Sequence, residues 1–285
     1  MLKITGRVRD LGDGFTVSRV LPQIALRTVG PFVFFDYFGP TDFPPGKGMD
    51  VRPHPHIGLA TVTYLFDGSL VHRDSIGAVK TIVPGDVNWM TAGRGIVHSE
   101  RTGLEPRATG HRLHGIQSWV GLPHDHEECT PGFQSVEAKD LPVSEKDGVT
   151  LRVVAGHAYG LVSPVHVFSG TFYVDARLSP HALLALPGDH AERAAFVVDG
   201  EVLTGGERFV RGDMIVFDAN ASATLFASAS AHVMLLGGAP LDGERHIWWN
   251  FVASTKERIE RAKKEWKTGR FGTIRGETEF IPLPE

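Results

Sequence analysis

Short apolar runs alternate with turn signals along the whole chain. Most of these runs are 4 to 10 residues long and end at Asp-Gly, Pro-Gly or Gly-Gly pairs, which is how antiparallel strands are usually delimited. Because strand and helix patterns do not alternate regularly, the sequence predicts an all-β sandwich or barrel. The expected strands include residues 32–35, 59–66, 79–83, 116–120, 151–154, 165–174, 195–198, 214–217 and 232–236.

One helix is predicted near the C-terminus. Ser254-Thr255-Lys256-Glu257 has the pattern of a capping box, in which the serine and glutamate side chains bond the free amides of the first turn. Ile259, Ala262 and Trp266 then fall on one helical face, and Gly269 stands where a helix stop is expected. We expect this helix to attach the C-terminal segment to a barrel.

A weak internal repeat predicts two tandem barrels. Pro84-Gly85-Asp86-Val87 has a counterpart in Arg211-Gly212-Asp213-Met214, and each follows a run that ends in Asp-Gly. Residues 130–148 are polar and lack periodicity, so the boundary is expected there. We place an N-terminal barrel at residues 1–135 and a C-terminal barrel with the helix at 136–285.

Composition narrows the function classes. The 285 residues are 42% hydrophobic and 22% charged, which indicates a globular protein with an ample core. The net charge is −4 and the basic residues are scattered, which argues against binding nucleic acid. No apolar run of 18 residues occurs, and the single cysteine, Cys129, cannot form an internal disulfide. We expect a cytoplasmic monomer without a membrane partner.

Two pairs of side chains carry the strongest chemical signal. In His54-Pro55-His56 and His98-Ser99-Glu100 the outer residues are two apart, so on a strand they point to the same face. Three imidazoles and one carboxylate are suited to a divalent first-row metal, with coordination positions left open for substrate. A His-x-His pair alone is common by chance in a chain with 14 histidines, so the surrounding order of motifs decides its weight.

Other histidines make weaker candidates. His124-Asp125-His126-Glu127-Glu128 is expected to be a charged loop, and His72 with Asp74 is expected at the rim of the site or as a partner of a ligand imidazole. His114 or Gln117 could line the mouth. When the two halves are aligned on Gly85 and Gly212, three of the four ligand positions lose their ligand, and His190 falls outside the register. The C-terminal barrel is therefore predicted to be metal-free.

The order of these motifs is similar to that of the two cupin motifs, and a longer match is more specific. The runs 54–64 and 84–100 resemble the signature segments of the pirin family, above all Trp89-Met90-Thr91-Ala92-Gly93-Arg94-Gly95. The run 113–120, the triplet Phe34-Phe35-Asp36 and the segment from Trp248-Trp249-Asn250-Phe251 to residue 271 fit the family too. The resemblance implies a bicupin of two jelly-roll barrels with one mononuclear metal, commonly iron (Fe²⁺), in the first barrel. His54, His56, His98 and Glu100 stand at the family's four ligand positions.

The resemblance also implies two kinds of function. One is a quercetin 2,3-dioxygenase, in which O₂ cleaves a flavonol or a related enol. In that reaction we assign Glu100 as the anionic ligand and as the candidate base for the substrate hydroxyl. The other is a non-catalytic metal protein that regulates a protein partner. An isomerase on the same barrel is a third alternative, because a fold does not fix a function.

Overall fold

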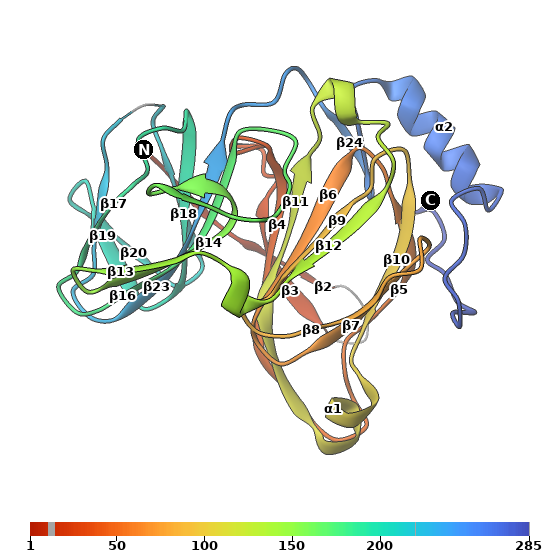
Figure 1. The fold of residues 1–285 in the computed structure, drawn as a ribbon, viewed down its shortest axis with the longest axis horizontal. Helices are drawn as coiled ribbons and strands as arrows, with labels where there is room; N and C mark the ends of the chain where they lie inside the picture. The colour runs from red at the N-terminus through yellow and green to blue at the C-terminus, as the bar shows by residue number, and fades with distance from the viewer. Residues whose placement is uncertain (11–14, 220, 285) are drawn as a thin grey trace. The chain divides into compact units, whose positions relative to one another are not determined.

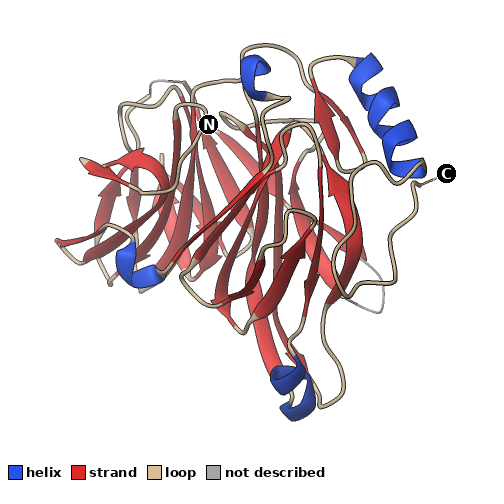
Figure 2. Cartoon of the chain, turned by 45° about the vertical axis from the view of Figure 1, so that its right-hand side comes forward, coloured by secondary structure: helices blue, strands red, loops and turns tan. Residues whose placement is uncertain are grey.

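The computed structural model describes residues 1–10, 15–219 and 221–284, and strands dominate it (Figure 2). The chain divides into two compact units, and each is built from segments that are far apart in sequence. We call unit 1 the unit that contains residues 1–10, 17–37 and 139–240, and unit 2 the unit that contains 38–138 and the residues after 240.

Unit 1 consists of two antiparallel sheets. The larger has the order β1-β21-β18-β23-β16-β14-β13, with β15 paired to β14, and the smaller has the order β17-β22-β19-β20. The strands of these sheets are β1 (Leu2–Thr5), β13 (Val143–Lys146), β14 (Val149–Ala158), β15 (Leu161–Val162), β16 (Thr171–Leu178), β17 (Leu183–Ala185), β18 (Glu192–Asp199), β19 (Glu201–Thr204), β20 (Glu207–Val210), β21 (Asp213–Phe217), β22 (Thr224–Phe226) and β23 (Ala231–Gly238). Two further strands, β2 (Arg7–Asp10) and β3 (Thr16–Leu21), are in neither sheet and pair in the order β4-β3-β2. A 3₁₀ turn, η2 (Ala138–Asp140), precedes β13.

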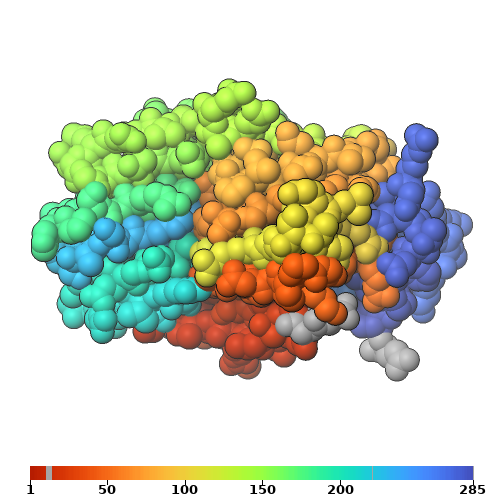
Figure 3. Space-filling model, turned by 90° about the horizontal axis from the view of Figure 1, so that it is seen from below, coloured from red at the N-terminus to blue at the C-terminus, as the bar shows by residue number. Residues whose placement is uncertain are grey.

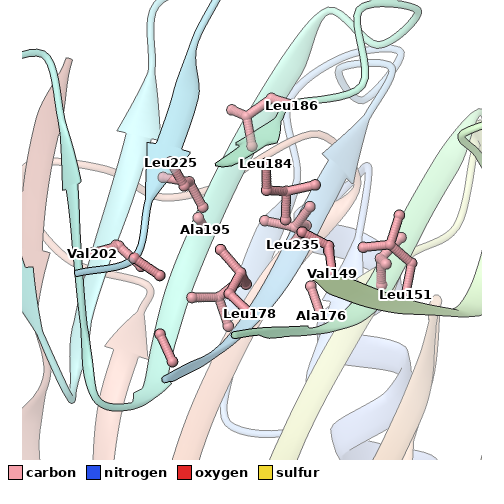
Figure 4. Packing of buried hydrophobic residues seen from close by; sticks show 14 of the residues in the cluster. Val149, Leu151, Ala176, Leu178, Leu184, Leu186, Ala195, Val202, Leu225 and Leu235 are labelled. Atoms are coloured by element: carbon pink, nitrogen blue, oxygen red, sulfur yellow. The ribbon is translucent and has the colours of Figure 1, made fainter. Parts of the chain in front are cut away.

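The core of unit 1 lies between these two sheets. Leu184 and Leu225 of the smaller sheet and Leu178 and Leu235 of the larger sheet are almost fully buried and pack in one cluster (Figure 4). The members alternate along each strand with side chains of the other face, which is the period of two that the sequence pattern predicts. Hydrophobic burial of this cluster stabilises the sandwich.

Unit 2 is a second pair of antiparallel sheets. One has the order β5-β10-β7-β8, and the other contains β12-β9-β6-β11-β4, whose members lie side by side in Figure 1. The strands are β4 (Phe32–Phe43), whose second half belongs to this unit, β5 (Asp50–His56), β6 (Leu59–Asp67), β7 (Leu70–Asp74), β8 (Val79–Ile82), β9 (Val87–Thr91), β10 (Ile96–Arg101), β11 (His111–Gly121) and β12 (Gly132–Val136). The unit also holds α1 (Leu104–Thr109), η1 (His124–His126), the hairpin β24 (His246–Trp248) with β25 (Phe251–Ala253), and α2 (Lys256–Lys267).

The predicted helix is confirmed as α2, but its cap differs from the expectation. Thr255 is the N-cap, because its side chain accepts a hydrogen bond from the Arg258 amide (3.2 Å). The Ser254 hydroxyl donates instead to the buried Glu127 carboxylate (2.7 Å). Ile259 and Ala262 are buried against β25, so the apolar face attaches the C-terminal segment as predicted.

The turn glycines of the repeat behave alike in both units. Gly85 and Gly212 have φ values of 81° and 90°, and the strands β9 and β21 begin at Val87 and Asp213. A positive φ is easily adopted only by glycine, which explains why the same Gly-Asp turn opens both strands. The repeat therefore predicted two similar barrels correctly.

Three expectations on organisation need correction. Residues 165–170 are not part of a strand, since β16 begins only at Thr171, and the expected linker contains β12 and β13. A single cut at 135/136 also does not describe the units. The N-terminal strand β1 pairs with β21 in unit 1, whereas α2 and the residues after 240 belong to unit 2. Strand pairing between distant segments, which a linear pattern does not record, decides this division.

Candidate metal centre

The two predicted pairs lie on adjacent strands of unit 2. His54 and His56 end β5, His98 and Glu100 are on β10, and His98 is paired opposite His54. The pairing shifts between His98 and Glu100, where β5 has one residue more than β10. A bulge of this kind turns side chains locally and is common beside functional sites. All four side chains are buried and point to one face of the sheet.

The three imidazoles form a compact group. Their ring centroids are 4.4 to 5.0 Å apart, and Nε2 of His56 lies 3.1 Å from Nε2 of His98. One nitrogen of each ring can be chosen so that all three lie within 4.8 Å of one another. A second such group consists of His72, His98 and Glu100, so His98 belongs to both.

Hydrogen bonds set the tautomers of two of the rings. The Nδ1 atoms of His54 and His56 lie 2.8 Å and 3.1 Å from the carbonyl oxygens of Arg52 and Asn250. Because a carbonyl only accepts, each Nδ1 carries the hydrogen and each Nε2 keeps its lone pair. Nδ1 of His98 is buried without a hydrogen-bond partner.

Burial keeps these rings neutral. It lowers the pKa of His54 to about 4, and it lowers the pKa values of His56 and His98 well below the ordinary value of 6.5. Neutral imidazoles whose Nε2 atoms face one another can each offer a lone pair to a cation. The residues present therefore fit a divalent metal ion.

Glu100 is held by the opposite sheet. Oγ1 of Thr63 on β6 donates to Glu100 Oε1 at 2.5 Å and lies 2.8 Å from Oε1 of Gln117 on β11. Burial raises the pKa of Glu100, while the bond from Thr63 acts in the other direction. A buried carboxylate of this kind is a strong proton acceptor and a good ligand for a divalent ion. The sequence predicted Glu100 but gave no sign of Thr63, which is an inward position of an ordinary apolar strand.

His72 and Asp74 do not lie at the rim of the site, which was one of the two positions predicted for them. Both are buried on β7, with His72 opposite Glu100 and Asp74 opposite His98. His72 Nε2 lies 3.0 Å from Asp74 Oδ2, and the Ile76 and Ala78 amides donate to Asp74 Oδ1. The pairing of β7 with β10, which the sequence does not encode locally, brings them beside the two ligand candidates.

The C-terminal hairpin supplies a further partner of the site. Ile57 forms a parallel bridge with Phe251, which brings the Asn250 carbonyl to His56. Gly58 allows this approach, because a Cβ atom at that position would lie 2.0 Å from the Val252 carbonyl oxygen and its φ is +66°. In the sequence, only the motif around Trp248–Asn250 could have indicated that this segment contacts the site.

Aromatic side chains close the site from the facing sheet. Trp119 on β11 makes an edge contact with His56 at 5.2 Å between centroids, and Phe133 on β12 stacks on His72 at 4.4 Å. These contacts show that the interior faces of the two sheets meet across the four candidate ligands. Such a setting excludes water and strengthens electrostatic interactions.

The remaining candidates lie elsewhere. His124 and His126 are in the exposed turn η1 as predicted, although Glu127 is buried and pairs with Arg245 (2.9 Å). The ring of His114 makes an edge contact with Phe66. In unit 1, His157, Asp189 and His190 form a third group whose potential ligand atoms lie within 4.8 Å of one another, a grouping that the alignment of the two halves did not predict.

The outer face of β5 and β10 is covered by the C-terminal segment. The Ile281 amide donates to the Pro53 carbonyl (2.8 Å), and Arg101 pairs with Glu277 (2.7 Å). The blue C-terminal residues lie against this part of unit 2 in Figure 3. Pro53 and Val97 line a cavity of about 570 Å³ under this segment, on the side of the strands opposite to His54 and His98. No helix in the described part of the chain is long and apolar enough to cross a bilayer.

Comparisons with known proteins agree with this architecture. The family model named "Pirin" matches residues 14–120, and the model named "Pirin C-terminal cupin domain" matches residues 173–272. A pirin-like protein of Caulobacter vibrioides is 49% identical over 100% of this chain and 99% of its own length. This chain belongs to the pirin family. Human pirin is 30% identical over 97% of the chain and 95% of its own length.

A solved structure gives the same assignment for the fold. Quercetin 2,3-dioxygenase from Acinetobacter baumannii matches with a TM-score of 0.92 at 32% identity, covering 100% of this chain and 95% of that one. The predicted bicupin fold and the pirin resemblance are both confirmed. Pirin and cupin family proteins bind a metal, and unit 2 of this chain contains a histidine-rich group that could hold one.

Proposed function

We propose that this pirin-family protein is a metal-dependent dioxygenase that cleaves quercetin-like flavonols or related enols with O₂. The observation that carries the proposal is the buried group of His54, His56 and His98 with Glu100 beside it. The likeness to a structure named quercetin 2,3-dioxygenase supports the choice of reaction.

In this proposal the three imidazoles and Glu100 hold one divalent ion. Iron(II) is the ion we propose, as the family resemblance implies. Three neutral ligands and one carboxylate would leave a net charge of about +1 on the site, which favours an anionic substrate. A bound divalent ion would supply the Lewis acidity that favours the deprotonated form of a substrate hydroxyl.

Side chains of the protein would move the proton, orient the carboxylate and exclude water. Glu100 would accept the proton of the substrate hydroxyl, because burial makes its carboxylate more basic than one in water. The Thr63 hydroxyl would fix the carboxylate while the proton is transferred. Trp119 and Phe133 would keep water away from the electron-rich anion that then reacts with O₂.

Oxygen consumption by iron-loaded protein over a panel of flavonols and other enols tests the proposal. We expect uptake that depends on the metal, with one carbon monoxide released for each O₂ consumed when a flavonol is cleaved. Metal analysis after anaerobic purification tests the choice of iron. If no flavonol or enol causes uptake, the reaction is wrong and the non-catalytic regulator of a protein partner becomes the better hypothesis. Turnover without oxygen uptake would indicate an isomerase.

A further inference from the structure

A row of polar side chains crosses the sheet that faces the metal centre. Gln117 is paired opposite Thr63, Thr63 opposite Asn88, and Asn88 opposite Ser135, on four adjacent strands. Directly opposed residues of antiparallel strands point to the same face. Because Thr63 contacts Glu100, the whole row belongs to the interior face.

Only one half of this row is satisfied by hydrogen bonds. Thr63 donates to Glu100 and lies 2.8 Å from Oε1 of Gln117, whereas both Oδ1 and Nδ2 of Asn88 are buried without a partner. Asn88 as a whole is only 3% exposed to solvent. The Ser135 hydroxyl beside it is also buried and unpartnered. Native proteins rarely retain such groups unless a ligand, ion or water uses them, since burying them costs free energy.

We propose that Asn88, together with Ser135, binds two adjacent hydroxyl groups on an aromatic ring of the substrate. The proposal rests on the proposed function and places this contact at the end of the substrate remote from the metal centre. Neighbouring strands are roughly 5 Å apart, so Asn88 lies about one strand spacing beyond the Thr63 that holds Glu100.

The chemistry of the row selects this ligand group. One hydroxyl can accept from Asn88 Nδ2 and its neighbour can donate to Oδ1, so that a vicinal pair satisfies both amide atoms at once. The row contains no cationic side chain, which argues against a carboxylate or phosphate. Met90 and Phe133 follow Asn88 and Ser135 two positions along the same face and give an apolar surface for the ring.

Anaerobic binding of two flavonols tests the proposal without turnover. Quercetin and galangin share the 3-hydroxy-4-keto end, but galangin lacks the two adjacent hydroxyls of the pendant ring. Dissociation constants are measured on metal-loaded protein by quenching of tryptophan fluorescence. We expect wild type to bind quercetin roughly tenfold to a hundredfold more tightly than galangin, which is the usual effect of leaving a built polar site unpaired.

Asn88→Leu keeps the size of the side chain and removes its polar atoms. It should reduce this preference to about one by weakening quercetin alone. Ser118→Ala is the matched control, because Ser118 is also buried with an unpartnered hydroxyl but points to the other face of β11. The control should keep the preference.

Urea unfolding of ligand-free protein gives a second readout. If the polar atoms of Asn88 are unpaired without a ligand, neither Asn88→Leu nor Asn88→Ala removes a hydrogen bond from the ligand-free protein. The unfolding midpoint of Asn88→Leu should therefore equal or exceed that of wild type. An unchanged preference for quercetin in both variants, or a leucine variant that unfolds much more easily than wild type, would overturn the proposal, as would wild type that binds neither flavonol.

The outcomes separate the subsite from the reaction. A wild type that binds quercetin with the expected preference but consumes no oxygen would reject the proposed dioxygenase and support the subsite. A wild type that cleaves both flavonols, with an Asn88→Leu variant that has the same preference, would reject the subsite and leave the dioxygenase in place.

Discussion

Among the described residues, both units contain side chains grouped as in a metal site, and the groups differ in their surroundings. In unit 2, His54, His56 and His98 are all buried. In unit 1, His190 is buried, but the side chains of His157 and Asp189 are 50% and 55% exposed. In each group the potential ligand atoms lie within 4.8 Å of one another, so these distances alone do not distinguish the two groups.

Orientation and solvation distinguish them instead. Nε2 of His190 lies 2.8 Å from the carbonyl oxygen of His157, so this nitrogen carries a hydrogen and its lone pair is not available. The half-exposed partners interact with water, which a metal would have to replace. In unit 2 the Nδ1 hydrogens of His54 and His56 are bonded outward, and the desolvated Nε2 atoms of His56 and His98 face each other. We therefore expect one metal per chain, bound in unit 2.

The largest effect is expected from His98→Ala, because His98 belongs to both groups of potential ligands in unit 2. Metal affinity should fall by well over 100-fold, roughly the largest loss caused by mutating a residue that only contacts a ligand. Elemental analysis of the purified variant measures the metal, and circular dichroism checks that the barrel remains folded. His124→Ala, in an exposed turn, is the control and should keep full occupancy. Full stoichiometry in His98→Ala would refute the ligand assignment.

Glu100→Gln should have the next largest effect. The amide keeps the shape and an oxygen donor but removes the charge and the basic site, so metal should bind more weakly and excess metal should restore occupancy. At full occupancy, turnover of a flavonol should still fall by roughly 10² to 10⁴, the usual contribution of a positioned base.

The pH profile separates the base from altered metal electronics. Wild type should lose activity on the acidic side as the carboxylate is protonated, and the variant should lack that acidic limb. Full oxygenase activity in metal-saturated Glu100→Gln would leave Glu100 as a ligand only.

An intermediate effect is expected from acid on the metal-free protein. Burial lowers the pKa of His54 to about 4, whereas histidines in the unfolded chain titrate near 6.5. The unfolded state therefore binds more protons between these values, and the free energy of unfolding should fall as the pH decreases from about 6.5 to 4. His54 alone would account for about 3 kcal/mol.

Urea unfolding at several pH values measures this dependence. His54→Gln should show a smaller decrease than wild type, and metal-saturated wild type should resist acid longer because the bound ion competes with the protons. Glu100 acts in the opposite sense, since burial raises its pKa and its ionisation costs stability as the pH increases. An equal decrease in wild type and His54→Gln would contradict the assignment of a neutral buried His54.

The smallest effect on the metal is expected in unit 1. His190→Ala should leave the metal content unchanged, although loss of the stacking on Phe172 should reduce stability. His157→Ala, at an exposed position, should change neither quantity. A loss of metal in either variant would show that exposure and a bonded Nε2 do not prevent binding, and the contrast between the two units would fail.

Local features of this protein were readable from its sequence. The alternation of apolar runs predicted the strands, the Gly-Asp turns at Gly85 and Gly212 predicted two similar barrels, and the i, i+2 spacing placed His54 with His56 and His98 with Glu100 on common faces. These features depend on backbone geometry over a few residues, which the residue types themselves impose.

Contacts between distant segments were decided only by the tertiary structure. The pairing of β7 with β10 buried His72 and Asp74 beside the site, and β25 brought the Asn250 carbonyl to His56. The predicted boundary assigned the terminal segments to the wrong units, because the partner of a strand depends on which sheet edge is free to pair with it. The residues of the strand itself do not determine that edge. Likewise Thr63 and Asn88 gained their roles from facing the other sheet. A side chain's position in its strand determines which face it occupies, but only the packing of the two sheets determines what it meets there.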